Sequence, residues 1–123
     1  GILRVFGLTA ACTGINEERA RRRKIDCGSV DLEYPSHAGY YPGAEEIFMK
    51  AVFEKGTGKI LGAQFTGRDG VDKRCDVMAA AIRMGATARD LTRFELCYAP
   101  PFGTPKDIVN VAGDLIEKKL GAE

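Results

Sequence analysis

The fold class is decided by residues 46–66, which read EIFMKAVFEKGTGKILGAQFT. Apolar side chains recur at every second position in residues 46–54 and again in residues 59–66, as expected of half-buried strands. The connection between them, residues 55–58, contains two glycines that can adopt the positive φ angles of a tight turn. The stretch therefore predicts a β-hairpin, whose two strands are antiparallel.

A further strand and a helix flank this hairpin. Residues 29–34 place Val30, Leu32 and Tyr34 on one face of a strand that Pro35 ends. Residues 72–84 carry apolar side chains at helical spacing, and Gly85 ends that predicted helix. A capping box at residues 87–90 starts a short helical turn, and residues 95–98 read as a short strand or an extended entry.

Both ends of the chain read as helical. We expect residues 1–24 to form two helical pieces, the first capped by Thr9 and the second by Asn16. In the last helix Thr104 is the expected cap, Pro105 occupies the first helical position, and Asp107 completes a capping box.

This order of elements predicts an α+β fold, an antiparallel β-sheet covered by helices on one side. The lack of repeated strand–helix units argues against a doubly wound parallel sheet. With 123 residues, the chain fits one domain, residues 1–123.

Composition narrows the range of functions. The net charge of +1 argues against binding to nucleic acid or to a membrane surface. The basic run at residues 19–24, RARRRK, is better explained as the solvated end of a helix. No apolar run approaches the roughly 20 residues that span a bilayer. Four widely spaced cysteines and a single histidine predict no metal site, and we expect reduced thiols in a cytoplasmic protein.

No complete catalytic site can be assembled from these residues. His37 is the only imidazole, and nothing in the sequence places a nucleophile beside it, so a hydrogen-bonding turn residue is the favoured interpretation. Two aromatic segments are more informative: residues 40–43, YYPG, and residues 98–103, YAPPFG. The double proline stiffens the second segment. Two interpretations of its aromatic side chains are equally good: they pack into the domain's own core, or they belong to a rigid surface element that enters a cleft of a partner.

Three segments together resemble a known family. They read HAGYYPGAEEI at 37–47, GKILGAQFTGRDGVDKR at 58–74 and YAPPFGTPKDIVNVAG at 98–113. The chain resembles the dimerisation domain of the FAD-dependent pyridine nucleotide-disulfide oxidoreductases, and in particular the branch of coenzyme A-disulfide reductases, NADH oxidases and persulfide reductases. The resemblance covers nearly the whole chain.

The resemblance implies that the chain is cut from a longer homodimeric enzyme whose FAD-binding and NAD(P)H-binding domains lie upstream. In such an enzyme Tyr98 and Tyr40, with Tyr41 as the substitute for Tyr40, would reach the partner subunit's active site and act on CoA disulfide or a related low-molecular-weight disulfide or persulfide. Pro101 and Phe102 would pack near the partner's flavin. The isolated chain is expected to bind neither cofactor and to be inactive. A parent that reduces oxygen and a free-standing homodimeric interaction module are the alternatives.

Overall fold

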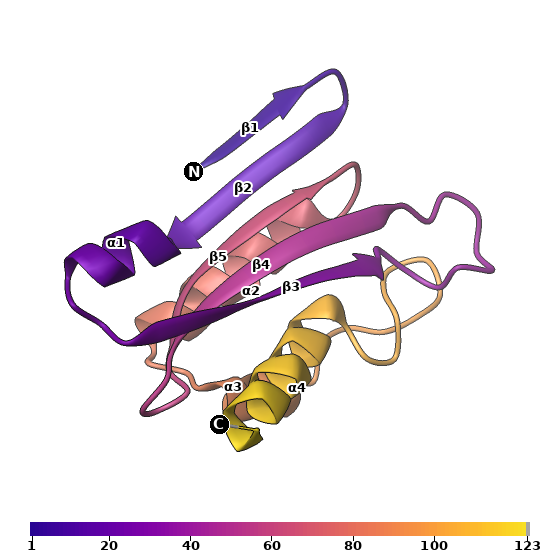
Figure 1. The fold of residues 1–123 in the computed structure, drawn as a ribbon. Helices are drawn as coiled ribbons and strands as arrows, with labels where there is room; N and C mark the ends of the chain where they lie inside the picture. Colours follow the sequence, from indigo (N-terminus) through magenta and orange to yellow (C-terminus); the bar gives the residue numbers. More distant parts are fainter. Residues whose placement is uncertain (123) are drawn as a thin grey trace.

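The computed structural model describes residues 1–122 as a five-stranded antiparallel sheet with helices packed mainly on one face (Figure 1). The strand order is β1-β2-β5-β4-β3. The strands are β1 (Ile2–Val5), β2 (Leu8–Gly14), β3 (Cys27–Pro35), β4 (Glu46–Glu54) and β5 (Ile60–Gly67). The helices are α1 (Glu17–Arg22), α2 (Val71–Arg83), α3 (Ala88–Thr92) and α4 (Ile108–Gly121). The predicted α+β class and antiparallel sheet are confirmed.

The core lies between the sheet and the layer formed by α2 and α4. The alternating side chains of the hairpin face this layer, as predicted: Ile47, Met49 and Ala51 are at most 2% exposed. Phe65 of β5 and Met78 of α2 are buried in the same cluster. Burial of each such side chain is worth about 1.5–3 kcal/mol, so this layer is the main source of the fold's stability.

The first 14 residues do not form the predicted helix. They form the β1–β2 hairpin, which turns at Phe6 and Gly7, both with positive φ. β2 then pairs with β5 from Thr9 opposite Gly67 to Gly14 opposite Gly62. This pairing joins residues about 50 positions apart, which a local pattern of caps cannot reveal. The second predicted helical piece is correct: α1 begins at Glu17 after the cap Asn16.

Two further expectations near the C-terminus are corrected. Residues 95–98 belong to no strand. The last helix begins at Ile108, so Thr104 is not its cap and Pro105 is not its first residue. Asp107 is the N-cap instead: its side chain accepts a hydrogen bond from the Val109 amide, and its own amide donates to Asn110. A buried carboxylate that also has a cationic partner therefore takes the place of the partly exposed Thr104 as the cap.

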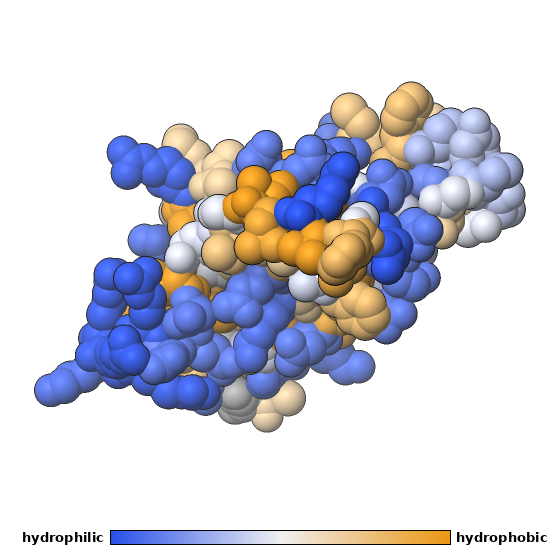
Figure 2. Space-filling view, turned by 90° about the horizontal axis from the view of Figure 1, so that it is seen from above, coloured by the Kyte–Doolittle hydropathy of each residue, from blue (hydrophilic) through white to orange (hydrophobic). Residues whose placement is uncertain are grey.

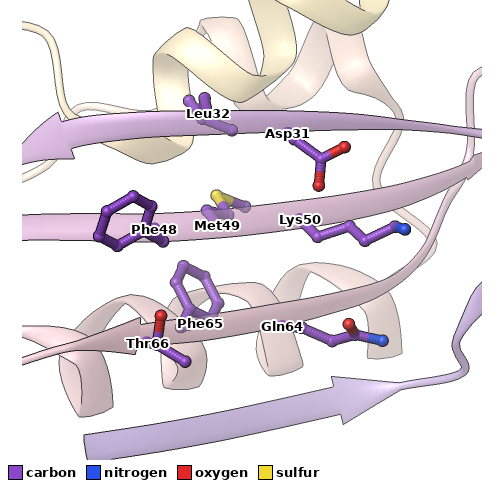
Figure 3. Close-up of a pocket in the computed structure, with 8 residues that line it drawn as sticks. All are labelled: Asp31, Leu32, Phe48, Met49, Lys50, Gln64, Phe65 and Thr66. Atoms are coloured by element: carbon purple, nitrogen blue, oxygen red, sulfur yellow. The ribbon is translucent and has the colours of Figure 1, made fainter. Parts of the chain in front are cut away.

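The sheet face opposite the core is less covered. α1 lies over one end of it, where Glu17 forms an ion pair with Lys50 of β4. The adjoining shallow groove has a volume of about 460 Å³. Among the residues that line it, Phe48 lies on β4 together with Lys50, and Gln64 and Thr66 lie on the neighbouring strand β5 (Figure 3). The edge strand β1 carries the exposed apolar side chains Ile2, Leu3 and Val5, and apolar surface gathers over this edge in Figure 2.

Candidate functional site at the two tyrosine loops

Two loops that are far apart in sequence meet at one end of the molecule. Residues 36–45 connect β3 to β4, and residues 93–107 connect α3 to α4; the two loops lie side by side in Figure 1. The amide of Ala38 in the first loop donates a 3.1 Å hydrogen bond to the carbonyl of Gly103 in the second. This bond brings together the two aromatic segments singled out in the sequence.

Each loop is also held by hydrogen bonds within itself. The amide of Ser36 donates to the Glu45 carbonyl at 2.8 Å, and the Ser36 hydroxyl accepts from the Glu45 amide at 3.0 Å, so the ends of the first loop are clamped. In the second loop, Phe102 and Gly103 both donate to the Ala99 carbonyl. That turn has Pro100 and Pro101 at its two central positions, and their rings fix the backbone torsion φ.

Tyr40 and Tyr98 lie at the meeting point of the loops, and both are exposed, by 79% and 48% respectively. Their phenols interact: a side-chain hydrogen bond with Tyr40 raises the pKa of Tyr98 above its ordinary value of 10.0. A raised pKa keeps the Tyr98 phenol protonated through the neutral range, so it remains a hydrogen-bond donor. The site can therefore present the phenol of Tyr98, beside that of Tyr40, to a molecule that approaches from outside.

The neighbouring Tyr41 is placed differently. Its ring stands edge-on to the imidazole of His37, with ring centroids 5.7 Å apart and an interplanar angle of 82°. His37 is 5% exposed and its Nδ1 lies 3.2 Å from the Ala38 carbonyl oxygen, so it is a buried residue of the loop rather than a surface group. Of the adjacent tyrosines, Tyr40 is the one beside Tyr98.

Pro101 and Phe102 form the tip of the second loop. Both are exposed, and the Phe102 carbonyl accepts a hydrogen bond from Lys73 of α2 at 3.4 Å. An exposed aromatic ring next to a proline is an apolar surface suited to contact with a flat ring system. It is not a cofactor site by itself, because it offers one open face.

Beneath the loops lies a buried ion pair that the sequence did not reveal. Nη2 of Arg74, in α2, donates to Oδ1 of Asp107 at 2.9 Å, and both side chains are almost fully buried. Asp107 was recognisable as a capping residue, but its arginine partner is 33 positions away on another helix. No buried side-chain polar atom among residues 1–122 lacks a hydrogen-bond partner.

Other chemical groups in the described residues form no second centre. Within residues 1–122, no cluster of histidine, cysteine, aspartate or glutamate side chains could hold a metal ion. The four cysteines carry free thiols, and burial raises the pKa of Cys75. Across the same residues, no helix combines the length and apolar character required to cross a membrane.

The structure thus defines a small α+β domain with two exposed tyrosines on a pair of joined loops. The dimerisation-domain profile of the pyridine nucleotide-disulphide oxidoreductases matches residues 3–107. The chain belongs to this family.

Curated relatives and solved structures agree with this assignment. A coenzyme A disulfide reductase from Staphylococcus epidermidis is 39% identical over 112 residues, which are 91% of this chain and 25% of that protein. The chain thus spans about a quarter of the length of that relative. The structure of reduced Bacillus anthracis CoADR-RHD superposes with a TM-score of 0.96 and 46% identity, covering 99% of this chain and 22% of that one.

Two other solved structures extend the comparison. An NAD-dependent persulfide reductase from A. fulgidus has a TM-score of 0.96 and 37% identity, over 99% of this chain and 23% of that one. A water-forming NADH oxidase from Lactobacillus brevis has a TM-score of 0.94 at 21% identity, over 99% of this chain and 27% of that one, and so shows the fold alone.

Proposed function

We propose that this chain is the dimerisation domain, spanning residues 1–123, of a homodimeric FAD-dependent NAD(P)H:disulfide oxidoreductase that reduces CoA disulfide. Tyr40 and Tyr98 act in the active site of the partner subunit. The observation that carries the proposal is the presence of two exposed tyrosines, Tyr40 and Tyr98, on two loops that the Ala38–Gly103 hydrogen bond fixes to each other. The 39% identity to a coenzyme A disulfide reductase supports CoA disulfide as the substrate.

The chemistry assigned to the phenols follows from their protonation. When a disulfide is reduced, one sulfur leaves as a thiolate, and a neutral phenol can donate a hydrogen bond to it. The ordinary pKa of a thiol, about 8.5, lies below that of a phenol, about 10, so the phenol remains the donor at neutral pH. In the proposed enzyme Tyr98 and Tyr40 stabilise the developing charge on the CoA sulfur by donating hydrogen bonds to it. Tyr41 is not assigned this role, because its ring packs on His37.

The cofactors are assigned to other parts of the parent protein. The sheet of this chain is antiparallel throughout, whereas dinucleotide-binding folds are built on parallel βαβ units. FAD and NAD(P)H, which would supply the two electrons, are therefore held by upstream domains of a longer chain. The exposed ring of Phe102 and the adjacent Pro101 would contact the partner's flavin as an apolar surface. The isolated chain is inactive in this proposal.

The location assigned to the complete enzyme is the cytoplasm. Four unpaired thiols, two of them exposed, suit a reducing compartment. A free-standing interaction module is the alternative, and the coding sequence upstream of Gly1 decides between them: FAD-binding and NAD(P)H-binding domains there support the enzyme, and a start codon next to Gly1 contradicts it.

The test is turnover by the complete polypeptide. Tyr40→Phe, Tyr98→Phe and the double variant should each reduce CoA disulfide more slowly than the wild type, while Tyr34→Phe, a half-buried tyrosine of β3, serves as the matched control. Wild-type turnover by the double variant would refute the role of the pair. A larger loss in Tyr41→Phe than in Tyr40→Phe would refute the choice between the adjacent tyrosines.

Persulfide reduction is the second candidate. Its support is the 37% identity over 99% of the chain to the A. fulgidus NAD-dependent persulfide reductase. Comparing kcat/KM for CoA disulfide and for a CoA persulfide, with oxygen consumption measured in the absence of both, separates the disulfide reductase, the persulfide reductase and the oxidase.

A further inference from the structure

Arg74 bonds to the segments on both sides of the tyrosine site. It lies in α2 and is 3% exposed. Its Nη2 donates to the Ser36 carbonyl at 2.7 Å, and the same nitrogen donates to Oδ1 of Asp107 at 2.9 Å. Nε donates to that Oδ1 atom at 3.2 Å, and Nη1 donates to the Gly70 carbonyl at 3.2 Å.

These acceptors stand at defined points of the two loops. Ser36 is the first residue of the loop that carries Tyr40, and Asp107 is the last residue of the loop that carries Tyr98. The guanidinium therefore joins the root of one loop to the root of the other. The Ala38–Gly103 hydrogen bond joins them again further along, nearer to the phenols.

We propose that Arg74 is a positioning residue that holds Tyr40 and Tyr98 in register with each other. The inference rests on the proposed function of that pair, and deepens it by identifying what keeps the pair together. Arg74 touches neither phenol in this arrangement. It acts through the backbone of Ser36 and the carboxylate of Asp107.

The arrangement depends on the shape of the guanidinium as well as on its charge. A planar fork supplies several N–H donors in fixed directions, whereas a lysine ammonium is a compact point charge on a flexible stem. Asp107 is held from both sides, because Oδ1 accepts from Arg74 while Oδ2 accepts from the Val109 amide at 3.1 Å. Rotation of this carboxylate is thus restricted, and the start of α4 is fixed relative to α2.

The first variant to test removes the pair without leaving a buried charge alone. In Arg74→Met/Asp107→Asn the asparagine can still cap α4, and neither partner carries a charge. Arg74→Lys keeps the charge but lacks the fork. Arg83→Met, an exposed arginine in the same helix, is the matched control.

Two readouts separate positioning from general stability. The first is the titration of Tyr98, followed by NMR of ¹³C-labelled tyrosine rings in the 123-residue chain, with far-UV circular dichroism to show that each variant is folded. The second is kcat for CoA disulfide in the complete polypeptide. We expect both Arg74 variants to shift the Tyr98 titration to lower pH and to lower kcat by about a hundredfold, as small misplacements of catalytic groups can do. Arg83→Met should change neither.

The outcomes distinguish this inference from the proposed function. A folded Arg74→Met/Asp107→Asn variant with the wild-type Tyr98 titration would overturn the positioning role. If Arg74→Lys behaved as the wild type, a positive charge alone would hold the two loops together, and the planar guanidinium would not be required. If the Tyr98 titration shifted while Tyr40→Phe/Tyr98→Phe turned over at the wild-type rate, the positioning role would stand and the proposed function would fail.

Discussion

Nη2 of Arg74 lies 2.9 Å from Oδ1 of Asp107, and the two side chains are 3% and 4% exposed. A buried ion pair of this kind makes little net contribution when compared with two apolar residues of the same size. Removing one partner is costly, however, because the remaining charge stays buried without a counter-charge. The pair therefore makes the two helices α2 and α4 depend on each other.

Asp107→Ala should be strongly destabilising. It removes the partner of Arg74 and the N-cap of α4 at once, and we expect a loss of about 3–5 kcal/mol in the free energy of unfolding. Asp107→Asn keeps a side chain that can cap α4, so it should lower the free energy of unfolding by less than Asp107→Ala does. Urea unfolding followed by circular dichroism measures both, and equal losses in the two variants would contradict the capping contribution.

Tyr40→Phe should lower the pKa of Tyr98. The hydrogen bond with Tyr40 raises that pKa, so its removal moves the titration of the Tyr98 phenol to lower pH. In the enzyme that we propose, the phenol donates only while it is protonated, so we expect activity to be lost as the pH rises through the pKa of Tyr98. The alkaline limb of the pH–rate profile should therefore move to lower pH in this variant, and an unchanged limb would show that Tyr98 does not limit activity there.

The ion pair between Glu17 and Lys50 should make stability depend on acidity. The hydrogen bond from Lys50 lowers the pKa of Glu17 below its ordinary value of 4.5. The stabilisation is therefore present above the pKa of the unfolded chain and is lost as the pH falls through the lower pKa of the folded state. Glu17→Gln should cost about 0.5–1 kcal/mol at neutral pH and nothing once the pH is well below that folded pKa.

Urea unfolding at the two pH values tests this dependence. Glu18→Gln is the control, because its partner Arg22 is equally exposed on α1 and the pair is open to solvent. If Glu18→Gln and Glu17→Gln lowered the free energy of unfolding equally, the Glu17–Lys50 ion pair would contribute no more stability than an ordinary surface ion pair.

Gly62→Ala should disrupt the junction between β5 and the segment after β2. A Cβ atom at Gly62 would lie 1.9 Å from the carbonyl oxygen of Ile15, which is backbone and cannot move aside. Strain of this kind costs about 1–3 kcal/mol or more in the free energy of unfolding. Gly56→Ala is the control, because no heavy atom lies within 4 Å of its added Cβ. Equal thermal midpoints for the two variants would show that the contact at Ile15 is relaxed.

The thiols should react at very different rates. Burial raises the pKa of Cys75, which lowers its thiolate fraction and shields it, whereas Cys12 and Cys97 are exposed. Iodoacetamide at mildly alkaline pH should modify Cys12 and Cys97 first and Cys75 only when the chain unfolds. Peptide mass spectrometry with and without guanidinium chloride measures this order, and rapid native labelling of Cys75 would mean that α2 opens readily from the sheet.

Much of the fold could be predicted from local patterns. The alternation around Met49, the stripe along α2 and the capping box at Thr87 are properties of neighbouring residues, and the structure confirms each of them. The β1–β2 hairpin could not be recognised in this way, because β2 is fixed by pairing with β5 rather than by its own pattern. The partner strand β1 is exposed at every position, so its sequence lacks the alternation of a half-buried strand.

The two aromatic segments of the candidate site could be singled out from the sequence, but the contacts that hold them together could not. Tyr40 and Tyr98 stand out beside glycines and prolines, and family resemblance linked them before any geometry was known. The choice between Tyr40 and Tyr41 needed the packing of the His37 ring. Nothing in the neighbouring sequence distinguishes Arg74 from other basic residues of an amphipathic helix. The positioning role proposed for it depends on two hydrogen-bond acceptors that are 38 and 33 positions away in the chain.

The position of Asp107 in the chain has a consequence for how the protein is made. Within this domain all five described strands are synthesised before Arg74, and its partner Asp107 follows 33 residues later. Until Asp107 has been synthesised, Arg74 cannot join the roots of the two loops. Within the domain, the tyrosine pair is therefore fixed only after all of these strands have been made.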